Sequence, residues 1–212
     1  MIYFLDTEFS NLDPISGDIL VMYLVIDNEQ NETVYEKEFR CQVQSRKYWE
    51  SEAEDIHGIS YTEASLYPHP KEMCASLLEL GEKYPCTKMV MQTTSNSWFD
   101  NDRKKRAWAW IDYYYLELTF RKHGNHYEFY KLFPLSVRES TIDLAKKAGI
   151  KKRGLKHLAE QFNLELNHHD AKSDTLVMRD IWQILTRNTK KTASRTTTTS
   201  RKTVYGFQQT LL

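Results

Sequence analysis

Apolar residues near the start of the chain occur in short runs, which predict three strands in sequence. Residues 2–5 form an apolar run with the bulky side chains that favour a buried strand. Residues 19–26 are apolar throughout, as in a strand buried on both faces, whereas residues 33–39 alternate like a strand with one solvated face. Turn residues at 11–18 and 27–31 separate these runs, so we expect a meander of three strands.

Farther along the chain the apolar positions recur mainly at helical spacing. This spacing predicts helices over residues 71–83, 99–122, 142–148, 155–162 and 170–187. Residues 88–92 form one more strand candidate among these helices. Strands followed by helices, with another strand among them, indicate an α/β layered domain over residues 1–187.

The chain changes character after residue 187. Residues 188–204 are rich in threonine, serine, lysine and arginine and contain almost nothing apolar, so we expect a flexible basic linker. Residues 205–212 then carry apolar side chains again. We therefore expect this terminal peptide to have a role of its own.

Composition narrows the function classes only slightly. The 29 Lys and Arg residues balance 29 Asp and Glu residues, so no overall positive field indicates a nucleic-acid partner. Three cysteines without a Cys-x-x-Cys pair disfavour a disulfide framework or a zinc site. No apolar run is long enough to span a membrane, and no export signal is recognisable. We expect a cytoplasmic protein without a membrane partner.

Two acids interrupt the first strand at a spacing of two. Asp6 and Glu8 should point to the same face of that strand, where two neighbouring carboxylates repel each other. A cation between them would relieve the repulsion, and hard oxygen ligands suit Mg²⁺ or Mn²⁺. The alternative interpretation is a strand end with two solvated acids.

Two later segments offer further ligands for such a cation. Asp100 follows the strand candidate at 88–92 and precedes a helical stretch, where its alternative role is a helix N-cap. His169 lies five residues before Asp174, and the small Ala171 between them would let both side chains approach one point. Taken one at a time, the two residues have alternative interpretations. His169 could be an ordinary loop residue, and Asp174 could be a favourable charge at a helix N-terminus.

Taken in this order, the segments resemble the motifs of the DEDDh branch of the DnaQ-like 3′–5′ exonucleases. The three similar segments are Asp6-Thr7-Glu8, Asn96 to Asp100, and His169 to Asp174. In that family the second motif has an Asn four residues before a metal-binding Asp, and the third reads His-x-Ala-x-x-Asp. The resemblance covers residues 1–186.

The chain also departs from this family pattern. Ser10-Asn11-Leu12 keeps only the leucine of a Thr-Gly-Leu segment that relatives often carry. Asp102 lies so close to Asp100 that the second motif leaves two candidate acids. His168 beside His169 creates a similar ambiguity, although the spacing to the third motif's aspartate favours His169.

The resemblance implies an RNase H-like fold, with a mixed sheet flanked by helices, to which the flexible C-terminal tail expected from composition is attached. It implies a two-metal 3′–5′ exodeoxyribonuclease that releases nucleoside monophosphates from single-stranded or frayed 3′ ends, in proofreading or repair. Four carboxylates would hold two Mg²⁺ or Mn²⁺ ions, and one histidine would be the general base. The implied metal ligands are Asp6, Glu8, Asp100 and Asp174, and the implied base is His169.

The same resemblance implies a set of substrate-binding residues, which are Thr7, Phe9, Leu12, His57 and Asn96. Phe9 and Leu12 would lie against the terminal base, with ordinary core packing as the alternative. His57 would lie near the terminal nucleotide or would simply fix a loop. The aromatic residues between 98 and 115 could form a stacking platform for single strands, but a buried helix face is the competing interpretation.

Two alternatives to the exodeoxyribonuclease stay open. An exoribonuclease that trims small RNAs would use the same residues, and a non-catalytic nucleic-acid-binding adaptor would use only the fold. The terminal peptide resembles the short segments by which replication proteins dock on a bacterial sliding clamp. The implied contacts to a clamp or a polymerase are Gln208, Leu211 and Leu212, and the alternative is a frayed terminus.

Overall fold

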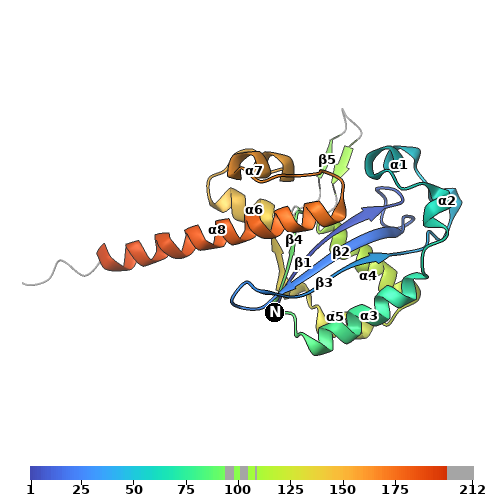
Figure 1. Ribbon diagram of the computed structural model, residues 1–212, viewed down its shortest axis with the longest axis horizontal. Coiled ribbons are helices and arrows are strands. Elements are labelled where there is room, and N and C mark those ends of the chain that lie inside the picture. The colour runs from blue at the N-terminus through green and yellow to red at the C-terminus, as the bar shows by residue number, and fades with distance from the viewer. Residues whose placement is uncertain (94–97, 101–104, 108, 200–212) are drawn as a thin grey trace, which may run out of the picture.

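The computed structural model describes residues 1–93, 98–100, 105–107 and 109–199 (Figure 1). Within these ranges, residues 98–100, 105–107 and 188–199 are described by their backbone alone. The fold is built on two sheets and two groups of helices. Its strands are β1 (Ile2–Phe9), β2 (Ile19–Asp27), β3 (Thr33–Arg40), β4 (Lys88–Met91), β5 (Trp98–Asp100), β6 (Lys105–Ala107) and β7 (Arg138–Ser140).

A five-stranded mixed sheet forms the centre, with the strand order β3-β2-β1-β4-β7. The meander β1-β2-β3 is antiparallel, as predicted, whereas β4 is parallel to both β1 and β7. The strand β7 was not predicted, because three residues are too few to show a periodic pattern. The parallel pairing of β1 with β4 brings the carboxyl ends of these two strands to the same edge of the sheet.

Helices cover both faces of this sheet, which confirms the predicted α/β class (Figure 1). One face carries α3 (Pro70–Lys83), α4 (Ile111–His123) and α5 (His126–Leu132). The other carries α6 (Thr141–Lys147), α7 (Leu155–Phe162) and α8 (Ala171–Thr199). Two short helices, α1 (Ser51–His57) and α2 (Tyr61–Ala64), connect β3 to α3, and 3-10 turns occupy Arg46–Tyr48 and Leu135–Val137.

The alternation of side chains along β1 decides which residues meet which helices. Tyr3 and Leu5 are buried in the core shared with α3, α4 and α5, whereas Ile2 and Phe4 are buried in the core shared with α6, α7 and α8. Because side chains alternate between the two faces of a strand, the residues that follow continue this pattern. Thr7 therefore belongs to the α4 face, and Asp6 and Glu8 belong to the α8 face.

The predicted helix over 99–122 begins later than its sequence indicates. Its first part forms the two-stranded hairpin of β5 and β6, and α4 begins only at Ile111. Aromatic residues favour strands as well as buried helices, so their density did not mark the boundary. Trp110 has the left-handed backbone angles φ 56° and ψ 45°, which a right-handed helix cannot include.

The helix α8 continues past residue 187, into the stretch for which we predicted a linker without regular structure. It ends at Thr199. Extending an existing helix fixes one residue for each new hydrogen bond, whereas starting a helix is costly, so a helix packed over its first half can grow into a polar sequence. Residues 200–212, which include Gln208, Leu211 and Leu212, lie outside the described residues. No helix of the described chain is long and apolar enough to cross a membrane.

Candidate active site

Three carboxylates meet where β1 ends and α8 begins. Asp6 and Glu8 come from the α8 face of β1, and Asp174 comes from the first turn of α8. One carboxylate oxygen of each residue lies within 4.8 Å of those of the other two. The structure thus brings together three of the four acids that the sequence motifs single out.

The start of α8 is fixed by its own cap. Asp170 accepts hydrogen bonds on Oδ1 from the backbone N–H groups of Lys172, at 3.0 Å, and Ser173, at 3.4 Å. Ala171 is buried against the core between α8 and the sheet. A larger side chain there would displace the first turn, so the small residue lets Asp174 approach the acids of β1.

Crowding and burial shift the acid–base properties of these carboxylates. Burial, followed by the charges of Asp112, Glu8 and Asp174, holds the pKa of Asp6 well above its ordinary range. Burial and the neighbouring acids raise the pKa of Glu8 to about 8. Burial also raises the pKa of Asp174, against an opposing effect of His168. A cluster of oxygen donors that repel one another fits Mg²⁺ or Mn²⁺, because a cation removes the repulsion.

Asp112 is a further acid near this site, outside the cluster of Asp6, Glu8 and Asp174, and the motif comparison missed it. It lies in the first turn of α4, is buried, and accepts a hydrogen bond of 2.6 Å on Oδ1 from the Thr7 hydroxyl. Burial raises its pKa to about 6, with the Thr7 hydrogen bond opposing the shift. Among neighbouring charges, Asp112 has the largest effect on Asp6. The usable signal was an acid in the first turn of a helix, but the aromatic stretch concealed where that helix starts.

The sequence assigned the fourth acid to Asp100 instead. The structure places Asp100 at the end of β5, in the hairpin that precedes α4, and describes only its backbone. Asn96 and Asp102 lie outside the described residues. A role of Asp100 or Asn96 at the site therefore stays a prediction.

The two histidines before α8 have different relations to Asp174. His168 lies with Nδ1 3.1 Å from Oδ2 of Asp174, whereas His169 donates its backbone N–H to the same oxygen at 3.2 Å. Their rings stack with centroids 3.9 Å apart. His169 has a φ of 69°, an uncommon value for a residue other than glycine, and its side chain is exposed. The His169 ring forms no hydrogen bond with a described residue, which leaves its nitrogens free to act on a ligand.

His57 fixes the wall of a shallow pocket beside Glu8. Its Nδ1 accepts a hydrogen bond of 3.0 Å from the backbone N–H of Ile59, so Nε2 carries the proton and donates to the carbonyl of Phe9, at 3.2 Å. Burial lowers the pKa of His57, which favours this neutral form. Both ring nitrogens bind backbone, so His57 holds α1 against the end of β1, which is the loop-fixing role weighed from the sequence.

Exposed apolar side chains flank this pocket, which Glu8, Phe9 and Leu12 help to line. Leu12 is 59 % exposed and Ile56, on α1, is 51 % exposed. The ring of Phe9 stacks on Tyr115 of α4 with centroids 3.7 Å apart, so one of its faces is already covered. Sequence reasoning missed Ile56, whose signal is a single isoleucine in the otherwise polar and acidic α1. The pocket thus offers Leu12 and Ile56 as free apolar surfaces next to the acids.

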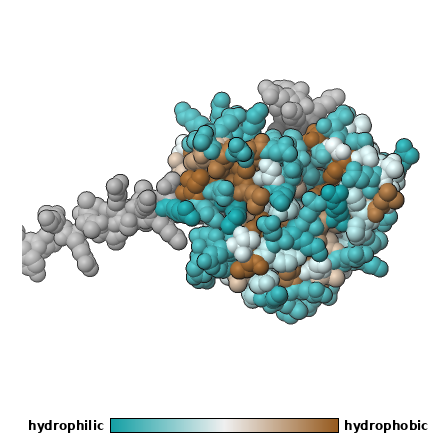
Figure 2. All heavy atoms as spheres, viewed as in Figure 1, coloured by the Kyte–Doolittle hydropathy of each residue, from teal (hydrophilic) through white to brown (hydrophobic). Residues whose placement is uncertain are grey.

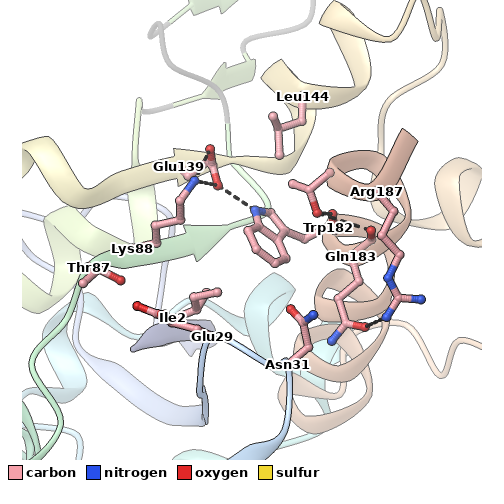
Figure 3. A pocket seen from close by; sticks show the side chains of 11 residues that line it. Ile2, Glu29, Asn31, Thr87, Lys88, Glu139, Leu144, Trp182, Gln183 and Arg187 are labelled. Carbon is pink, nitrogen blue, oxygen red and sulfur yellow. Dashed lines mark hydrogen bonds and ion pairs between the residues drawn. The ribbon is translucent and has the colours of Figure 1, made fainter. Parts of the chain in front are cut away.

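A larger cavity than this pocket lies elsewhere in the described part of the chain. It has a volume of about 610 Å³ and lies where β1 and β4 begin, at the sheet edge opposite the acids (Figure 3). Its wall contains Lys88 and Trp182, which both donate hydrogen bonds to the carboxylate of Glu139, at 3.0 and 2.6 Å (Figure 3). Lys88, Trp182 and Glu139 thus satisfy one another's hydrogen bonds.

The free energy of unfolding of the metal-free protein is expected to fall as the pH rises from about 5 to 8. Glu8 has an ordinary pKa of 4.5 and a pKa of about 8 in the fold, so the folded state binds more protons across this window. Mg²⁺ competes with these protons, so it should raise the melting temperature more at pH 8 than at pH 5. Thermal unfolding at both pH values, with and without Mg²⁺, measures this difference. A melting temperature at pH 8 that is the same with and without Mg²⁺ would contradict a cation site.

Among known proteins, only solved structures are similar to this chain. No family model matches the chain, and no curated protein shows significant similarity to it. E. coli exonuclease I in complex with a dT13 oligonucleotide is similar over 92 % of this chain, with a TM-score of 0.70 and 16 % identity. The zinc-bound complex of the same enzyme with single-stranded DNA gives 0.69 over 88 % of the chain, at 16 % identity. A product-bound structure of exonuclease I gives 0.65 over 87 %, at 17 % identity.

This chain spans only about two fifths of those proteins, covering 42 %, 40 % and 42 % of their chains in the same order. At this identity the similarity shows the fold, which is the mixed five-stranded sheet flanked by helices of the exonuclease I nuclease domain. The predicted RNase H-like fold class is thereby confirmed.

Proposed function

We propose that this chain is a metal-dependent 3′–5′ exonuclease that hydrolyses DNA at single-stranded or frayed 3′ ends and releases nucleoside monophosphates, in proofreading or repair. The observation that carries this proposal is the convergence of Asp6, Glu8 and Asp174 at one point, with raised pKa values. The fold similarity to exonuclease I, solved with single-stranded oligonucleotides, supports it.

The acids would hold the cations and the histidines would handle the proton. Bound Mg²⁺ or Mn²⁺ would supply charge neutralisation at the phosphate and activation of water. Asp6, Glu8 and Asp174 are the ligands that the geometry favours, with Asp112 or Asp100 as the fourth. Two ions are the number that the motif resemblance implies.

His169 is the proposed general base. Burial and the neighbouring His168 lower its pKa below the ordinary value, so the ring is neutral at neutral pH and can accept a proton from the attacking water. The His168 ring contacts Asp174 and is therefore suited to orienting that carboxylate. The terminal base would lie between Leu12 and Ile56, and Thr7, Phe9 and His57 would support the pocket from behind.

One assay tests this function against its two rivals. Labelled DNA and RNA oligonucleotides of the same sequence are incubated with the full chain, with Mg²⁺ or with a chelator. Mg²⁺-dependent release of mononucleotides from the 3′ end of DNA is expected. Faster decay of the RNA would favour an exoribonuclease that trims small RNAs. Binding of either strand without any cleavage would favour a non-catalytic adaptor.

Replacing His169 by Ala is expected to slow hydrolysis by roughly 10²–10⁴-fold, the usual contribution of a general base. Wild type should lose rate at acidic pH, where the imidazole is protonated, and the His169→Ala variant should not show this pH dependence. Rate profiles against pH for His169→Ala and wild type measure both effects. His168→Ala is the matched control and should lose less, by weakening only the orientation of Asp174. A larger loss for His168→Ala would assign the base to His168 instead.

We also propose that the terminal peptide tethers the nuclease to a sliding clamp. Two leucines could fill an apolar pocket while a glutamine amide fixes their register by hydrogen bonds. The relevant residues are Gln208, Leu211 and Leu212. A tether of this kind raises the local concentration of the enzyme at a 3′ end without strong contacts.

Deleting residues 206–212 is expected to abolish binding to a bacterial sliding clamp and to leave cleavage of short free oligonucleotides unchanged. Direct titration of the clamp with the intact and the shortened chain measures the first effect. An intact chain that shows no clamp binding would contradict the tether and leave the nuclease assignment untouched.

A further inference from the structure

The segment that joins α6 to α7 concentrates positive charge. Six basic residues occur between Asp143 and Glu160 without any acid among them, namely Lys146, Lys147, Lys151, Lys152, Arg153 and Lys156. All five lysines are exposed, and none forms an ion pair with a described residue. We call these six residues the α6–α7 basic surface. Figure 2 shows hydrophilic side chains at the top left of the body, where α7 lies in Figure 1.

The backbone that carries this surface is anchored on both sides. Ile150 donates its N–H to the carbonyl of Ala145 at 2.9 Å and packs against the core between the sheet and α8. Leu155 is buried in the same core. Gly149, with a φ of +79°, makes the reversal after α6 that a larger residue would resist. The lysines between these anchors are therefore presented outward from a fixed loop.

The basic surface and the acidic site lie at the same edge of the sheet. In the parallel pair of β1 and β4, the last partners are Phe4 and Val90, and both Asp6 and Gln92 follow at the carboxyl side of this pair. The Gln92 side chain donates a hydrogen bond of 2.9 Å to the backbone carbonyl of Arg153. One side chain thus links the basic surface to the end of β4, at the sheet edge where β1 carries Asp6. Both α6 and α7 also contact α8, whose first turn carries Asp174 (Figure 1).

A basic surface at this place would offset the repulsion between the acids and a nucleic-acid strand in the proposed function. A phosphodiester strand that approaches Asp6, Glu8 and Asp174 meets negative charge, and the zero net charge of the chain provides no general attraction. A local positive surface at the same edge of the sheet makes the electrostatic potential that the strand meets less negative. Phosphates require only charge and position from lysine side chains, so no base recognition is needed.

We propose that the α6–α7 basic surface binds the phosphate backbone of a nucleic-acid strand, upstream of the nucleotides that occupy the acidic site. The direction of the strand rests on the proposed function, whereas the binding itself does not. An acidic protein segment is the other occupant with suitable charge. It is less well matched, because the six residues of this surface are all basic and offer no apolar anchor.

The test compares two variants with the same change of net charge. The basic-surface variant carries Lys146→Gln, Lys147→Gln, Lys151→Gln and Lys152→Gln. The control carries four exposed lysines of β3, α3 and α5 changed in the same way, namely Lys37→Gln, Lys71→Gln, Lys83→Gln and Lys131→Gln. All of these side chains lie at the surface, so both variants should fold, and circular dichroism verifies this.

Binding is measured by fluorescence anisotropy in the presence of a chelator, so that hydrolysis does not interfere. With single-stranded DNA of about 20 nucleotides, the basic-surface variant should bind at least about tenfold more weakly than wild type, and its slope of log affinity against log salt should shrink by about 2 to 3. The control should match wild type in both measurements. Equal behaviour of the two variants, or no binding by wild type, would overturn the inference.

Two further arms separate the alternatives. Hydrolysis of a trinucleotide with Mg²⁺, which in the proposed function occupies the acidic site alone, should be the same for wild type and both variants. A wild type that cleaves nothing would refute the proposed function, while the binding result still decides the inference. A polyglutamate peptide of equal charge should displace the DNA poorly. Displacement as efficient as by unlabelled DNA would overturn the inference in favour of an acidic protein partner.

Discussion

Replacing Asp6, Glu8 or Asp174 by its amide is expected to slow hydrolysis of a 3′ end by roughly 10³-fold or more, because loss of a metal ligand removes several kcal/mol of charge stabilisation. The metal-free variants should be as stable as wild type or slightly more stable. Each change removes one charge from a cluster whose members raise one another's pKa values. Mononucleotide release and the melting temperature without metal measure the two effects.

The matched control for Glu8→Gln is Glu82→Gln on the exposed surface of α3. It makes the same chemical change far from the acids and should leave both measurements unchanged. A Glu8→Gln protein that retains the wild-type rate would refute the assignment of the site. A protein that is inactive because its melting temperature collapses would instead show that the acids support the fold.

Asp112→Asn is expected to lower the rate about as much as Asp6→Asn, by roughly 10³-fold. We propose that this buried acid supplies the fourth carboxylate, because it accepts a hydrogen bond from Thr7, the residue between Asp6 and Glu8 on β1, and its charge contributes to the raised pKa of Asp6. The amide oxygen of Asn can still accept the hydrogen bond from Thr7, so the fold should hold. Rates and melting temperatures of the two variants provide the comparison.

Asp100→Asn and Asp102→Asn decide between this assignment and the one made from the motif. Both should retain a rate within a few-fold of wild type if Asp112 is the ligand. An inactive Asp100→Asn beside an active Asp112→Asn would restore the original assignment. Thr7→Val, which removes the hydrogen bond but no charge, should raise the Mg²⁺ concentration needed for half-maximal rate, whereas Thr7→Ser should restore it. Thr7 is a positioning residue in this interpretation.

The strands could be predicted because their signals are local. The apolar run of β2 is buried along its whole length, as its composition indicated. The period of a strand placed Asp6 and Glu8 on one face, and the small Ala171 in the third motif indicated a close approach of Asp174. These predictions depend on residues a few positions apart, where sequence spacing and spatial distance agree.

Asp112 could not be predicted in the same way, because its position depends on where α4 begins. Trp110 ends the preceding segment in a left-handed conformation, and nothing in the aromatic stretch marks that change. The motif spacing therefore pointed to Asp100, the first acid after β4. The orientation of the His168 ring towards Asp174 could not be predicted either, because the motif spacing favours His169 and gives no information on the direction of the neighbouring ring.

The helix α4 makes two contacts with the end of β1, which are one helical turn apart. Its first turn carries Asp112, which accepts a hydrogen bond from Thr7 of β1, and its next turn carries Tyr115, whose ring stacks on Phe9 and whose hydroxyl donates to the carbonyl of Asn11. One helix thus contacts β1 between Asp6 and Glu8 and also supports Phe9 in the neighbouring pocket. If the proposed function holds, a displacement of α4 would move the support of the acids and the wall of the pocket together.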